Sequence, residues 1–403
     1  MKLIAGNRSA FERCIDDSYS PETSIVSRYR NTMQFDGDTE KDGIFKKYLL
    51  ENSILEGVRI VKLLTYKGVT IQILDETSRM ATGSLKAIDG CLTTAHCRME
   101  GAQRVAFESG GNSGSAFTRY GRQAGLETFF FCPLDNIDLL NSKLFDRSKA
   151  HLIGVEDRNL VKELTGLFAT TTKFRHVPDK SWRYTAAMFR GLFILEQMLV
   201  SNKFDWITQT VSAGFGPIGI YKVLKAFQSE ILSLPRFLGI QQEANSPMFE
   251  AWKSKSSGIQ GKTEHGEKLL TRVMYDNSPQ TYKTYSDLQQ LLLLSQGDLL
   301  TINGVEYDSY TDPAAEYGSL LELFLSHGID ITIKAGQVIE KTGIIALVGT
   351  LKAIDAGTIA AGSSVLCCLT SGVCEGDGLA QPELTVRNPQ DILEYVKAVF
   401  PIP

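Results

Sequence analysis

The sequence predicts an α/β protein with two open, twisted domains built on parallel sheets. Three observations lead to this fold class. Short apolar runs alternate with longer amphipathic segments along most of the chain, the pattern of strands and helices in parallel sheets. The 403 residues exceed what one hydrophobic core usually holds, so two domains are expected. Glycine- and serine-rich loops follow several predicted strands, where ligands bind in such sheets.

The first part of the chain starts irregularly and then becomes periodic. Residues 1–45 are polar and mixed in character, and we expect an arm or short helices on the surface. The pattern then predicts strand 69–74, a helix from about residue 85, strand 104–107, helix 115–124 and strand 128–132.

The alternation continues in the second part. It predicts strand 151–155, helix 185–199, strand 206–211, helix 219–227, strand 236–241, helix 344–354 and strand 364–369. Residues 253–287 are polar and rich in Gly, Lys and Ser, which indicates an insertion. Four loops follow strands and are expected on one edge: 82–84, 109–114, 212–219 and 370–372.

Composition limits the possible partners. The net charge of -4 and the lack of a Lys/Arg run argue against nucleic acid or an anionic membrane surface. Apolar stretches such as the one around 291–294 are too short to span a bilayer. The N-terminus lacks the apolar core of a secretory signal, so we expect a cytoplasmic protein.

The seven cysteines do not form a recognisable metal or disulfide pattern. No C-x-x-C pair occurs, and the cluster of Cys91, His96 and Cys97 offers only three ligands with a spacing unlike common zinc sites. We therefore predict no metal and interpret the cysteines as small buried hydrophobes.

The stretch Gly214-Phe215-Gly216-Pro217-Ile218-Gly219 predicts a phosphate site. Glycines let backbone N–H groups approach an anion, and the following helix directs its positive end toward it. The pattern G-x-G-x-x-G also occurs in nicotinamide enzymes, and Glu243 lies near the acidic position which that class requires. Pro217 removes one amide from the turn, which counts against that alternative. A nicotinamide-dependent oxidoreductase that uses residues 214–219 stays the second hypothesis.

A lysine after the first of these loops is a candidate nucleophile. Lys86 follows Thr82-Gly83-Ser84-Leu85 at a strand-to-helix turn, a partly desolvated setting in which an amine can form a Schiff base. A solvated lysine at a helix start is the alternative interpretation. The same pentapeptide, LKAID, recurs at 351–355, but Lys352 has no glycine loop before it, and we interpret it as structural.

Together, these segments resemble the fold-type II pyridoxal-phosphate (PLP) enzymes of the tryptophan synthase β-like kind, and among them the threonine synthase family. The resemblance covers roughly residues 55–375 in collinear order. TGSLK resembles the family's TGSFK, ESGGNSGSAF resembles its SSGNTGAA loop, and VSAGFGPIGIYKVLKAF resembles its glycine-rich phosphate cradle. IEKTGIIALVGTLKAIDAG resembles EPASAAxIAGLLKAIDxG, VLCCLTSG resembles VVCxxTGxG, and RFLGIQQEANSPMFEAW resembles the strand and loop after the cradle.

The resemblance implies a role for each matching residue. Lys86 is the catalytic lysine, which carries the cofactor as an internal aldimine and acts as a base. Its implied cofactor contacts are Asn112, Ser212, Ala213, Gly214, Phe215, Gly216, Glu340 and Thr370. The loops that flank them offer hydroxyls and amides for a substrate carboxylate, and these candidates are Thr82, Ser84, Ser109, Gly111 and Ser113. Arg119 and Arg122 could meet a substrate phosphate, although helix arginines are more often solvated.

The family also implies a domain division, an assembly and a reaction class. Residues 1–89 and 206–403 would form the larger, PLP-binding domain, residues 90–205 a smaller mobile one, and the protein a homodimer. A neutral hydroxyl such as that of Thr370 at the pyridine nitrogen favours β- or γ-elimination or replacement over transamination. The implied activity is a threonine synthase-like lyase or synthase acting on an amino acid with a phosphate or acyl side chain.

The chain differs from the family pattern at two places. The Asp-Arg that follows the family's lysine is absent after Lys86, and Gly110 replaces a serine in the asparagine loop. Both positions are near the expected substrate site, so the substrate is left open. A cysteate synthase-like β-replacement on phosphoserine is the alternative within the same class.

Overall fold

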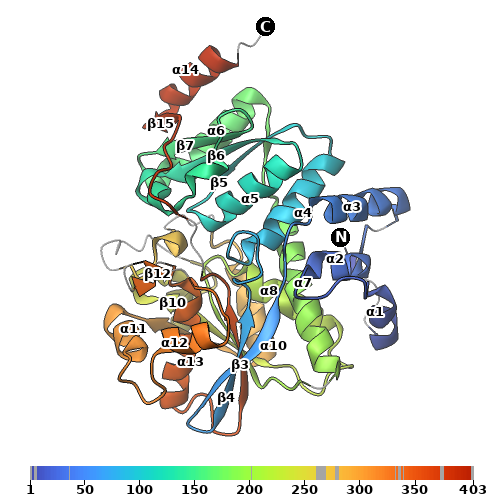
Figure 1. Ribbon diagram of the computed structural model, residues 1–403, viewed down its shortest axis with the longest axis vertical. Coiled ribbons are helices and arrows are strands. Elements are labelled where there is room, and N and C mark those ends of the chain that lie inside the picture. Colours follow the sequence, from blue (N-terminus) through green and yellow to red (C-terminus); the bar gives the residue numbers. More distant parts are fainter. Residues whose placement is uncertain are drawn as a thin grey trace.

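The computed structural model of the chain describes residues 2–3, 7–35, 37–200, 202–259, 269–276, 281–331, 333–334, 337–338, 340–372 and 376–400. Within these residues, two units lie one above the other, each built around one larger sheet (Figure 1). No helix in this part of the chain is both long and apolar enough to cross a membrane. The predicted two-sheet α/β architecture is confirmed.

The lower unit contains a six-stranded sheet with the order β11-β10-β9-β14-β4-β3. Its strands are β3 (Arg59–Tyr66), β4 (Val69–Asp75), β9 (Trp206–Thr210), β10 (Arg236–Gln242), β11 (Asp298–Ile302) and β14 (Ser364–Leu369). Neighbouring strands are parallel, for example β14 and β9 from the pair Val365 and Trp206 onward. The exception is the edge strand β3, which forms an antiparallel hairpin with β4 and which the sequence pattern did not predict.

The upper unit contains a five-stranded, fully parallel sheet with the order β15-β7-β6-β5-β8. Its strands are β5 (Arg104–Glu108), β6 (Glu127–Pro133), β7 (Ala150–Val155), β8 (Arg175–His176) and β15 (Leu384–Val386). Two small antiparallel pairs complete the strands: β1 (Lys2–Leu3) with β2 (Met33–Gln34), and β12 (Ile333–Lys334) with β13 (Gln337–Val338).

The α-helices connect these strands and cover the sheets. They are α1 (Arg8–Cys14), α2 (Ile25–Tyr29), α3 (Thr39–Asn52), α4 (Lys86–Met99), α5 (Asn112–Gln123), α6 (Val161–Thr172), α7 (Lys180–Val200), α8 (Phe215–Ala226), α9 (Pro247–Lys253), α10 (Tyr285–Ser295), α11 (Gly304–Thr311), α12 (Leu320–Ser326), α13 (Thr342–Asp355) and α14 (Pro389–Val399).

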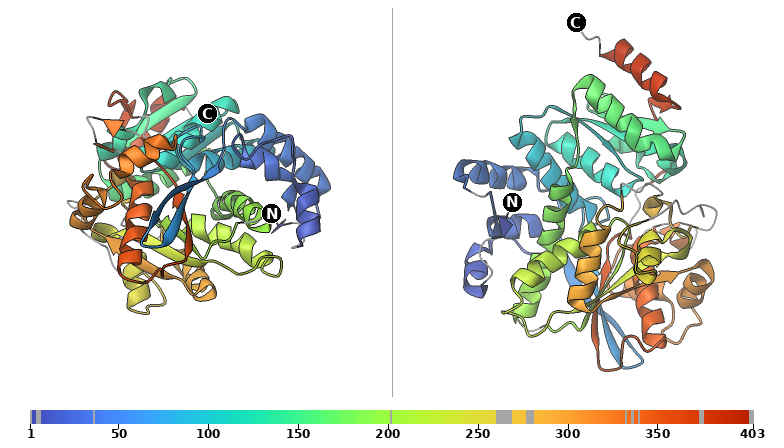
Figure 2. Two further views of the ribbon diagram at one scale, coloured as in Figure 1. Left: turned by 60° about the horizontal axis from the view of Figure 1, so that its bottom comes forward. Right: turned by 180° about the vertical axis from the view of Figure 1, so that it is seen from behind.

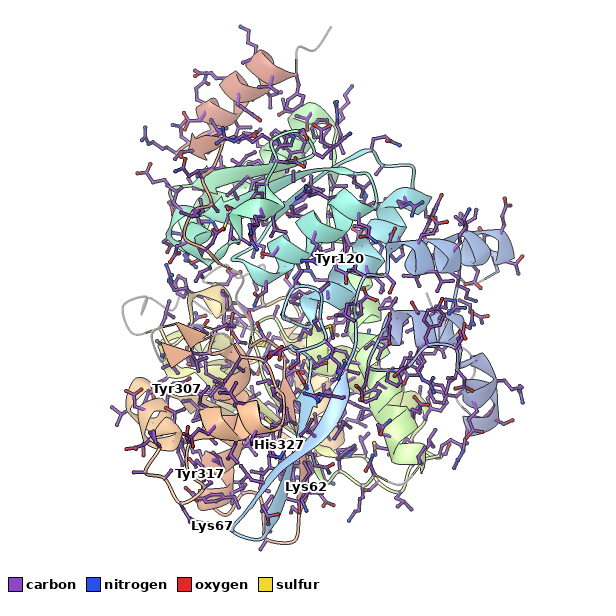
Figure 3. All side chains as sticks on the ribbon, viewed as in Figure 1. Lys62, Lys67, Tyr120, Tyr307, Tyr317 and His327 are labelled. Atoms are coloured by element: carbon purple, nitrogen blue, oxygen red, sulfur yellow. The ribbon has the colours of Figure 1, made fainter. Side chains whose placement is uncertain are left out.

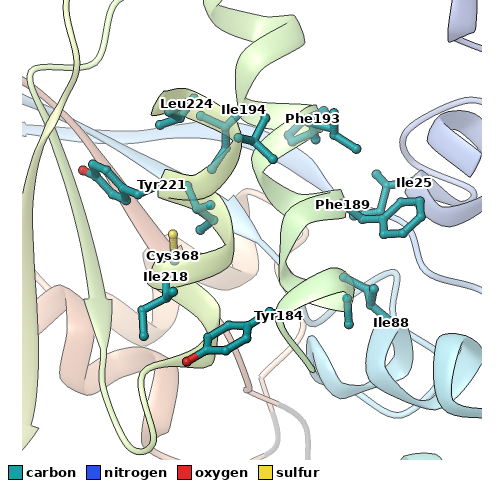
Figure 4. Packing of buried hydrophobic residues seen from close by; sticks show 14 of the residues in the cluster. Ile25, Ile88, Tyr184, Phe189, Phe193, Ile194, Ile218, Tyr221, Leu224 and Cys368 are labelled. Atoms are coloured by element: carbon teal, nitrogen blue, oxygen red, sulfur yellow. The ribbon is translucent and has the colours of Figure 1, made fainter. Parts of the chain in front are cut away.

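Each face of the six-stranded sheet has its own hydrophobic core. On one face α8 packs against α7. Figure 4 shows Phe189 of α7 beside Ile25, with Ile218 and Leu224 on α8. The other face is covered by α13, whose residues are almost all buried. The two helix layers hold the carboxyl ends of the strands in fixed positions.

The strand sequence TFFFC shows how the upper sheet divides its core. Successive side chains of a strand point to opposite faces, so Phe129 and Phe131 pack against α6 and α14, and Phe130 packs toward α5. Tyr120 of α5 lies where the upper unit meets the N-terminal segment (Figure 3), and its hydroxyl donates to the buried carboxylate of Glu56.

The expected N-terminal short helices are present. The helices α1, α2 and α3 lie along one side of the molecule, beside α4 and α7 (Figure 2). They are more than a surface arm, because Phe11, Tyr29 and Phe45 are fully buried in the main core.

The domain division stays a prediction, but two segments join a different unit from the one that the predicted boundaries assign to them. Strand β15 and helix α14 return from the C-terminus to the upper sheet, where residues 384–386 pair with β7. Helix α7, which the sequence assigns to the smaller domain, packs mainly on α8 of the lower unit. Neither segment has a compositional signal, because its amphipathic pattern is the same as that of its neighbours.

Part of the predicted insertion, 260–268 and 277–280, lies outside the described residues, as does Cys374.

Candidate active site

A cavity of about 750 Å³ lies between the two units, at the carboxyl ends of strands from both sheets. All four predicted loops contribute to its wall, and their lining members include Ser84, Asn112, residues 212–217 and Thr370. The sequence could place these loops on one edge because consecutive parallel strands end on the same side of a sheet.

Lys86 is the first residue of α4 and lines the cavity. Its loop is held against the loop after β14, because Leu85 N–H donates to the Thr370 carbonyl over 2.9 Å and Ser84 forms an antiparallel bridge with Ser371. The Lys86 Nζ atom lies 2.8 Å from the Oδ2 atom of Asp89, one helical turn on. The amine is therefore at the cavity and ion-paired within its own helix.

Lys352, the residue of the repeated LKAID sequence, is in a different setting. It is outside the lining of the cavity within the described residues. Its Nζ atom donates to the Thr301 carbonyl over 2.9 Å and lies 2.5 Å from Glu306. These contacts agree with its interpretation as a structural residue.

The glycine loop after β9 presents unpaired amides to the cavity. Gly214 adopts a left-handed conformation with φ of 76° at the N-cap of α8, which glycine tolerates best. In the described part of the chain, no acceptor takes the N–H groups of residues 212–216. Thr284, which also lines the cavity, donates its hydroxyl to the Ala213 carbonyl and so holds the loop. The third glycine has another function: a Cβ on Gly219 would lie 2.3 Å from the Cβ of Ala187, so Gly219 allows α7 and α8 to approach.

Asn112 is joined to two residues from the C-terminal half of the chain. Its side-chain amide donates to Ser371 Oγ over 3.1 Å and to Glu340 Oε2 over 3.3 Å. Burial raises the pKa of Glu340, and hydrogen bonds from Thr342, Asn112 and Ser371 partly offset this shift. The structure thus brings together Asn112, Glu340 and the loop that contains Thr370, as the sequence predicts.

The candidate substrate residues divide into two groups. Ser84, Ser109 and Ser113 line the cavity. Thr82 is buried beside it, and its hydroxyl has no partner among the described residues. Gly111, which has φ of 149° and lies against Val273, also shapes its loop without belonging to the lining.

The cavity wall is rich in cations that sequence reasoning missed. They are Arg158, Lys162, Arg175, Lys180, Arg183 and Lys283. Several are paired, such as Arg158 with Asp135 and Lys162 with Asp276. Arg183 and Lys283 have no carboxylate within ion-pair distance in the part of the chain described here. The basic first turn of α7 is a sequence signal for Arg183 but not for Lys283, which precedes α10.

The predicted phosphate contacts on α5 are not part of the described cavity lining. Arg122 lies 3.1 Å from Asp146 and donates to nearby carbonyls, and neither it nor Arg119 is among the lining residues. Arg122 is thus held against residues 143–146.

A histidine–glutamate pair also lines the cavity and was not predicted. The Nε2 atom of His176, at the end of β8, lies 2.8 Å from Oε2 of Glu108, at the end of β5. The hydrogen bond to Glu108 raises the pKa of His176, although burial opposes this shift. The two residues join neighbouring strands whose ends reach the cavity together.

Comparison with known proteins identifies the family. Residues 58–289, more than half of the chain, match the family described as pyridoxal-phosphate dependent enzyme. The chain belongs to this family. Its cofactor is PLP, which decides between the two cofactors that the glycine loop alone left open, and the nicotinamide hypothesis is set aside.

Individual relatives agree with this assignment. Over 322 residues the chain is 25% identical to the threonine synthase of Synechocystis sp., which covers 76% of this chain and 71% of that protein. The structure is similar to threonine synthase from Escherichia coli, with a TM-score of 0.61, 12% identity and coverage of 100% and 85% of the two chains. It is similar to diaminopropionate ammonia lyase from Escherichia coli, with a TM-score of 0.60, 12% identity and coverage of 99% and 98%. The fold is that of the fold-type II PLP-dependent enzymes.

The residues present fit this cofactor. Lys86 supplies an amine on the cavity wall, and the free amides of residues 212–216 form a cradle for an anion at the N-terminus of α8. A Cβ at Gly216 would lie 2.6 Å from side-chain atoms beneath the loop, so the cradle depends on the absence of a side chain there. These groups match an aldehyde that carries a phosphate.

Proposed function

We propose that the chain is a threonine synthase-like lyase or synthase that eliminates or replaces an anionic group at the β- or γ-carbon of an amino acid. The observation that carries this proposal is the charge of the cavity wall. Seven basic side chains line the cavity, Lys86 and the six cations named above. Five of them have a carboxylate partner, so the uncompensated charge among the described residues belongs to Arg183 and Lys283. The chain as a whole has a net charge of -4, so this excess is local and favours an anionic substrate.

Lys86 has two roles in the proposal, covalent attachment of PLP and movement of a proton. When bound, PLP supplies an electron sink for negative charge at the carbon next to the substrate amino group. When it is not joined to the cofactor, the free Lys86 amine would take the proton from that carbon, as a base positioned at the start of α4. Asp89, 2.8 Å from Nζ, accepts a hydrogen bond from the ammonium form and so orients the side chain.

The remaining predicted residues position the cofactor and the substrate. Amides of residues 212–216 bind the phosphate of PLP, while Asn112 and Thr370 contact its ring and Glu340 holds Asn112. The hydroxyls of Ser84, Ser109 and Ser113 bind the substrate carboxylate. Thr82 and Gly111 shape the same loops from outside the cavity lining.

Arg183 and Lys283 favour phosphate over acyl as the leaving group. Both line the cavity without an ion-pair partner among the described residues, and a doubly charged phosphate gains more from two cations than a neutral ester does. This preference includes homoserine phosphate, the substrate of a threonine synthase, and phosphoserine, the substrate of the cysteate synthase-like alternative.

Turnover of four amino acids tests the proposal. We expect release of phosphate from phosphoserine or homoserine phosphate, and slower or no turnover of O-acetylserine and diaminopropionate. Arg183→Gln and Lys283→Gln should each raise the KM of the phosphorylated substrate by about tenfold, which corresponds to about 1.4 kcal/mol.

Lys222→Gln is the matched control for the two cation variants. Lys222 belongs to α8, and its Nζ atom lies over the ring of Tyr184, the residue after Arg183 on α7. Lys222 is absent from the described lining of the cavity. Its substitution should leave the KM unchanged. Turnover confined to O-acetylserine or diaminopropionate, with a KM that is insensitive to Arg183 and Lys283, would contradict the anionic substrate.

The assembly and the location also belong to the proposal. By analogy with the family we propose a homodimer, which multi-angle light scattering of the purified chain measures directly. The cytoplasm is the proposed location.

A further inference from the structure

Arg190 is a fully buried arginine for which the proposed chemistry has no role. It lies in the middle of α7 with 1% of its side chain exposed, and its partner Glu76, just after β4, is 0% exposed. Its Nε atom donates to Oε1 of Glu76, and its Nη2 atom donates to Oε2 over 2.6 Å. Nη2 also donates to the side-chain oxygen of Gln209, on β9, over 2.8 Å. Two edges of the guanidinium are therefore satisfied.

The third nitrogen of Arg190 faces the glycine loop. Its Nη1 atom is buried and has no hydrogen-bond partner among the described residues. A Cβ added to Gly216 would lie 2.6 Å from this Nη1 atom and 2.6 Å from Nε2 of Gln209. Two side-chain nitrogens thus come close to the backbone of the loop from below, at the point where a side chain is missing.

An unpaired guanidinium edge in this position is unfavourable unless a negative charge lies nearby. A buried donor without an acceptor is destabilising, and more so when the group is charged. Burial opposes the charge of Arg190, but Glu76 more than offsets it, so the pKa of Arg190 is raised and the cation is permanent. The carboxylate of Glu76 lies on the far side of the guanidinium, which leaves the positive edge directed at the loop.

We propose that Arg190 is a positioning residue that holds a fixed positive charge behind Gly216 and thereby selects the phosphorylated form of the cofactor. This inference rests on the proposed placement of the PLP phosphate on residues 212–216. Within a weakly polarisable interior, a charge behind a thin backbone layer acts strongly on an anion on the other side. Glycine at 216 is required because any side chain would occupy the space between the loop and the guanidinium.

A purely structural role is the competing explanation. The same ion pair connects α7 with the end of β4 and with β9, so its loss could loosen the site in general. The two explanations differ in one respect. A charge effect acts on the phosphate of PLP only, whereas a loosened site weakens binding of pyridoxal, which lacks the phosphate, as well.

The test compares the dissociation constants of PLP and pyridoxal on the cofactor-stripped full chain. The double substitution Arg190→Met with Glu76→Gln removes the cation without leaving a buried carboxylate unpaired. We expect the preference for PLP over pyridoxal to fall at least tenfold, through weaker PLP binding at nearly constant pyridoxal binding. An equal loss of affinity for both compounds, or an unchanged preference, would overturn the proposal.

A second variant changes the charge in the opposite direction and covers the case in which the double variant does not fold. Glu76→Gln alone keeps Arg190 and removes its counter-charge, so the preference for PLP should rise. A fall or no change would count against the fixed cation.

The matched control is Arg28→Met with Glu196→Gln. This ion pair, 2.6 Å long and 11% and 17% exposed, also involves α7 but lies away from the glycine loop. The preference should remain that of the unmodified chain. If PLP binds at Lys86 and the preference is insensitive to Arg190, only the Arg190 proposal fails. If PLP does not attach to Lys86 at all, the proposed function fails first.

Discussion

At the scale of single residues, the charge of the cavity depends on side chains from distant parts of the chain. Lys86 begins α4, Arg183 lies in the first turn of α7, and His176 ends β8. The pair that His176 forms with Glu108 contributes a charge that depends on protonation.

The His176–Glu108 pair predicts a pH dependence of substrate binding. Glu108 raises the pKa of His176 above its ordinary value of about 6.5, so the imidazole stays protonated to higher pH and adds positive charge to the cavity. As the pH rises through the raised pKa, this charge is lost and the KM of an anionic substrate should increase, by up to about fivefold for one partly exposed charge. Steady-state kinetics between pH 6 and 9 measures the change.

Two variants isolate this contribution from other titrating groups. In Glu108→Gln the increase in KM should occur at lower pH, because the main group that raises the pKa of His176 is gone, while Arg175 and Asp179 beside it remain. In His176→Gln that component of the increase should disappear. Identical profiles in all three proteins would show that the imidazole does not face the substrate.

Local motifs decide which of these residues the sequence predicts. Lys86 and the glycine loop follow predicted strands and have residue types suited to an amine nucleophile and an anion, while Asn112 came from the family resemblance. Arg183 and His176 were missed, because each joins the cavity through an element distant in sequence from these loops. Arg190 had one usable signal, a cation within a largely buried helix stripe.

At the scale of elements, periodicity predicts most helices and strands but not their exact starts. Helix α5 begins at Asn112, three residues before the predicted start, because the loop glycines allow the chain to enter the helix immediately. The edge strand β3 was missed because half-exposed edge strands have weaker apolar patterns than central ones. The helix α10, whose apolar run at 291–294 was noted only for its length, begins at Tyr285, inside the predicted insertion.

The contact between α7 and α8 predicts a stability effect at Gly219. Gly219→Ala should destabilise the protein by about 1–3 kcal/mol, because the new Cβ would lie 2.3 Å from that of Ala187 and overpack the helix interface. Urea unfolding, followed by circular dichroism, measures the change. Gly166→Ala is the control: it lies within α6 with nothing within 4 Å of its added Cβ, so alanine's helix propensity should stabilise it by about 0.5–1 kcal/mol. Equal effects of the two substitutions would contradict the close packing.

At the scale of the whole molecule, the site exists only because two sheets present their strand ends to one cavity. The loops of Lys86, residues 212–216 and Thr370 come from the lower unit, and those of Asn112 and His176 from the upper one. Contacts such as Arg272 with Asp138, 2.8 Å apart, connect the two across the cavity rim. The α/β class and the order of the loops follow from the sequence. The return of β15 and α14 to the upper sheet does not, because strand pairing across more than 200 residues leaves no local pattern.

The most direct test of the account locates the covalent bond between the chain and its cofactor. Treatment of the holoenzyme with borohydride should fix PLP on one lysine, and mass spectrometry of proteolytic peptides should identify it as Lys86. Lys86→Ala should abolish the labelling, while Lys352→Ala, in the second LKAID sequence, should retain it. Labelling of any other lysine, or full labelling of Lys86→Ala, would contradict the central claim that this cavity is the PLP site.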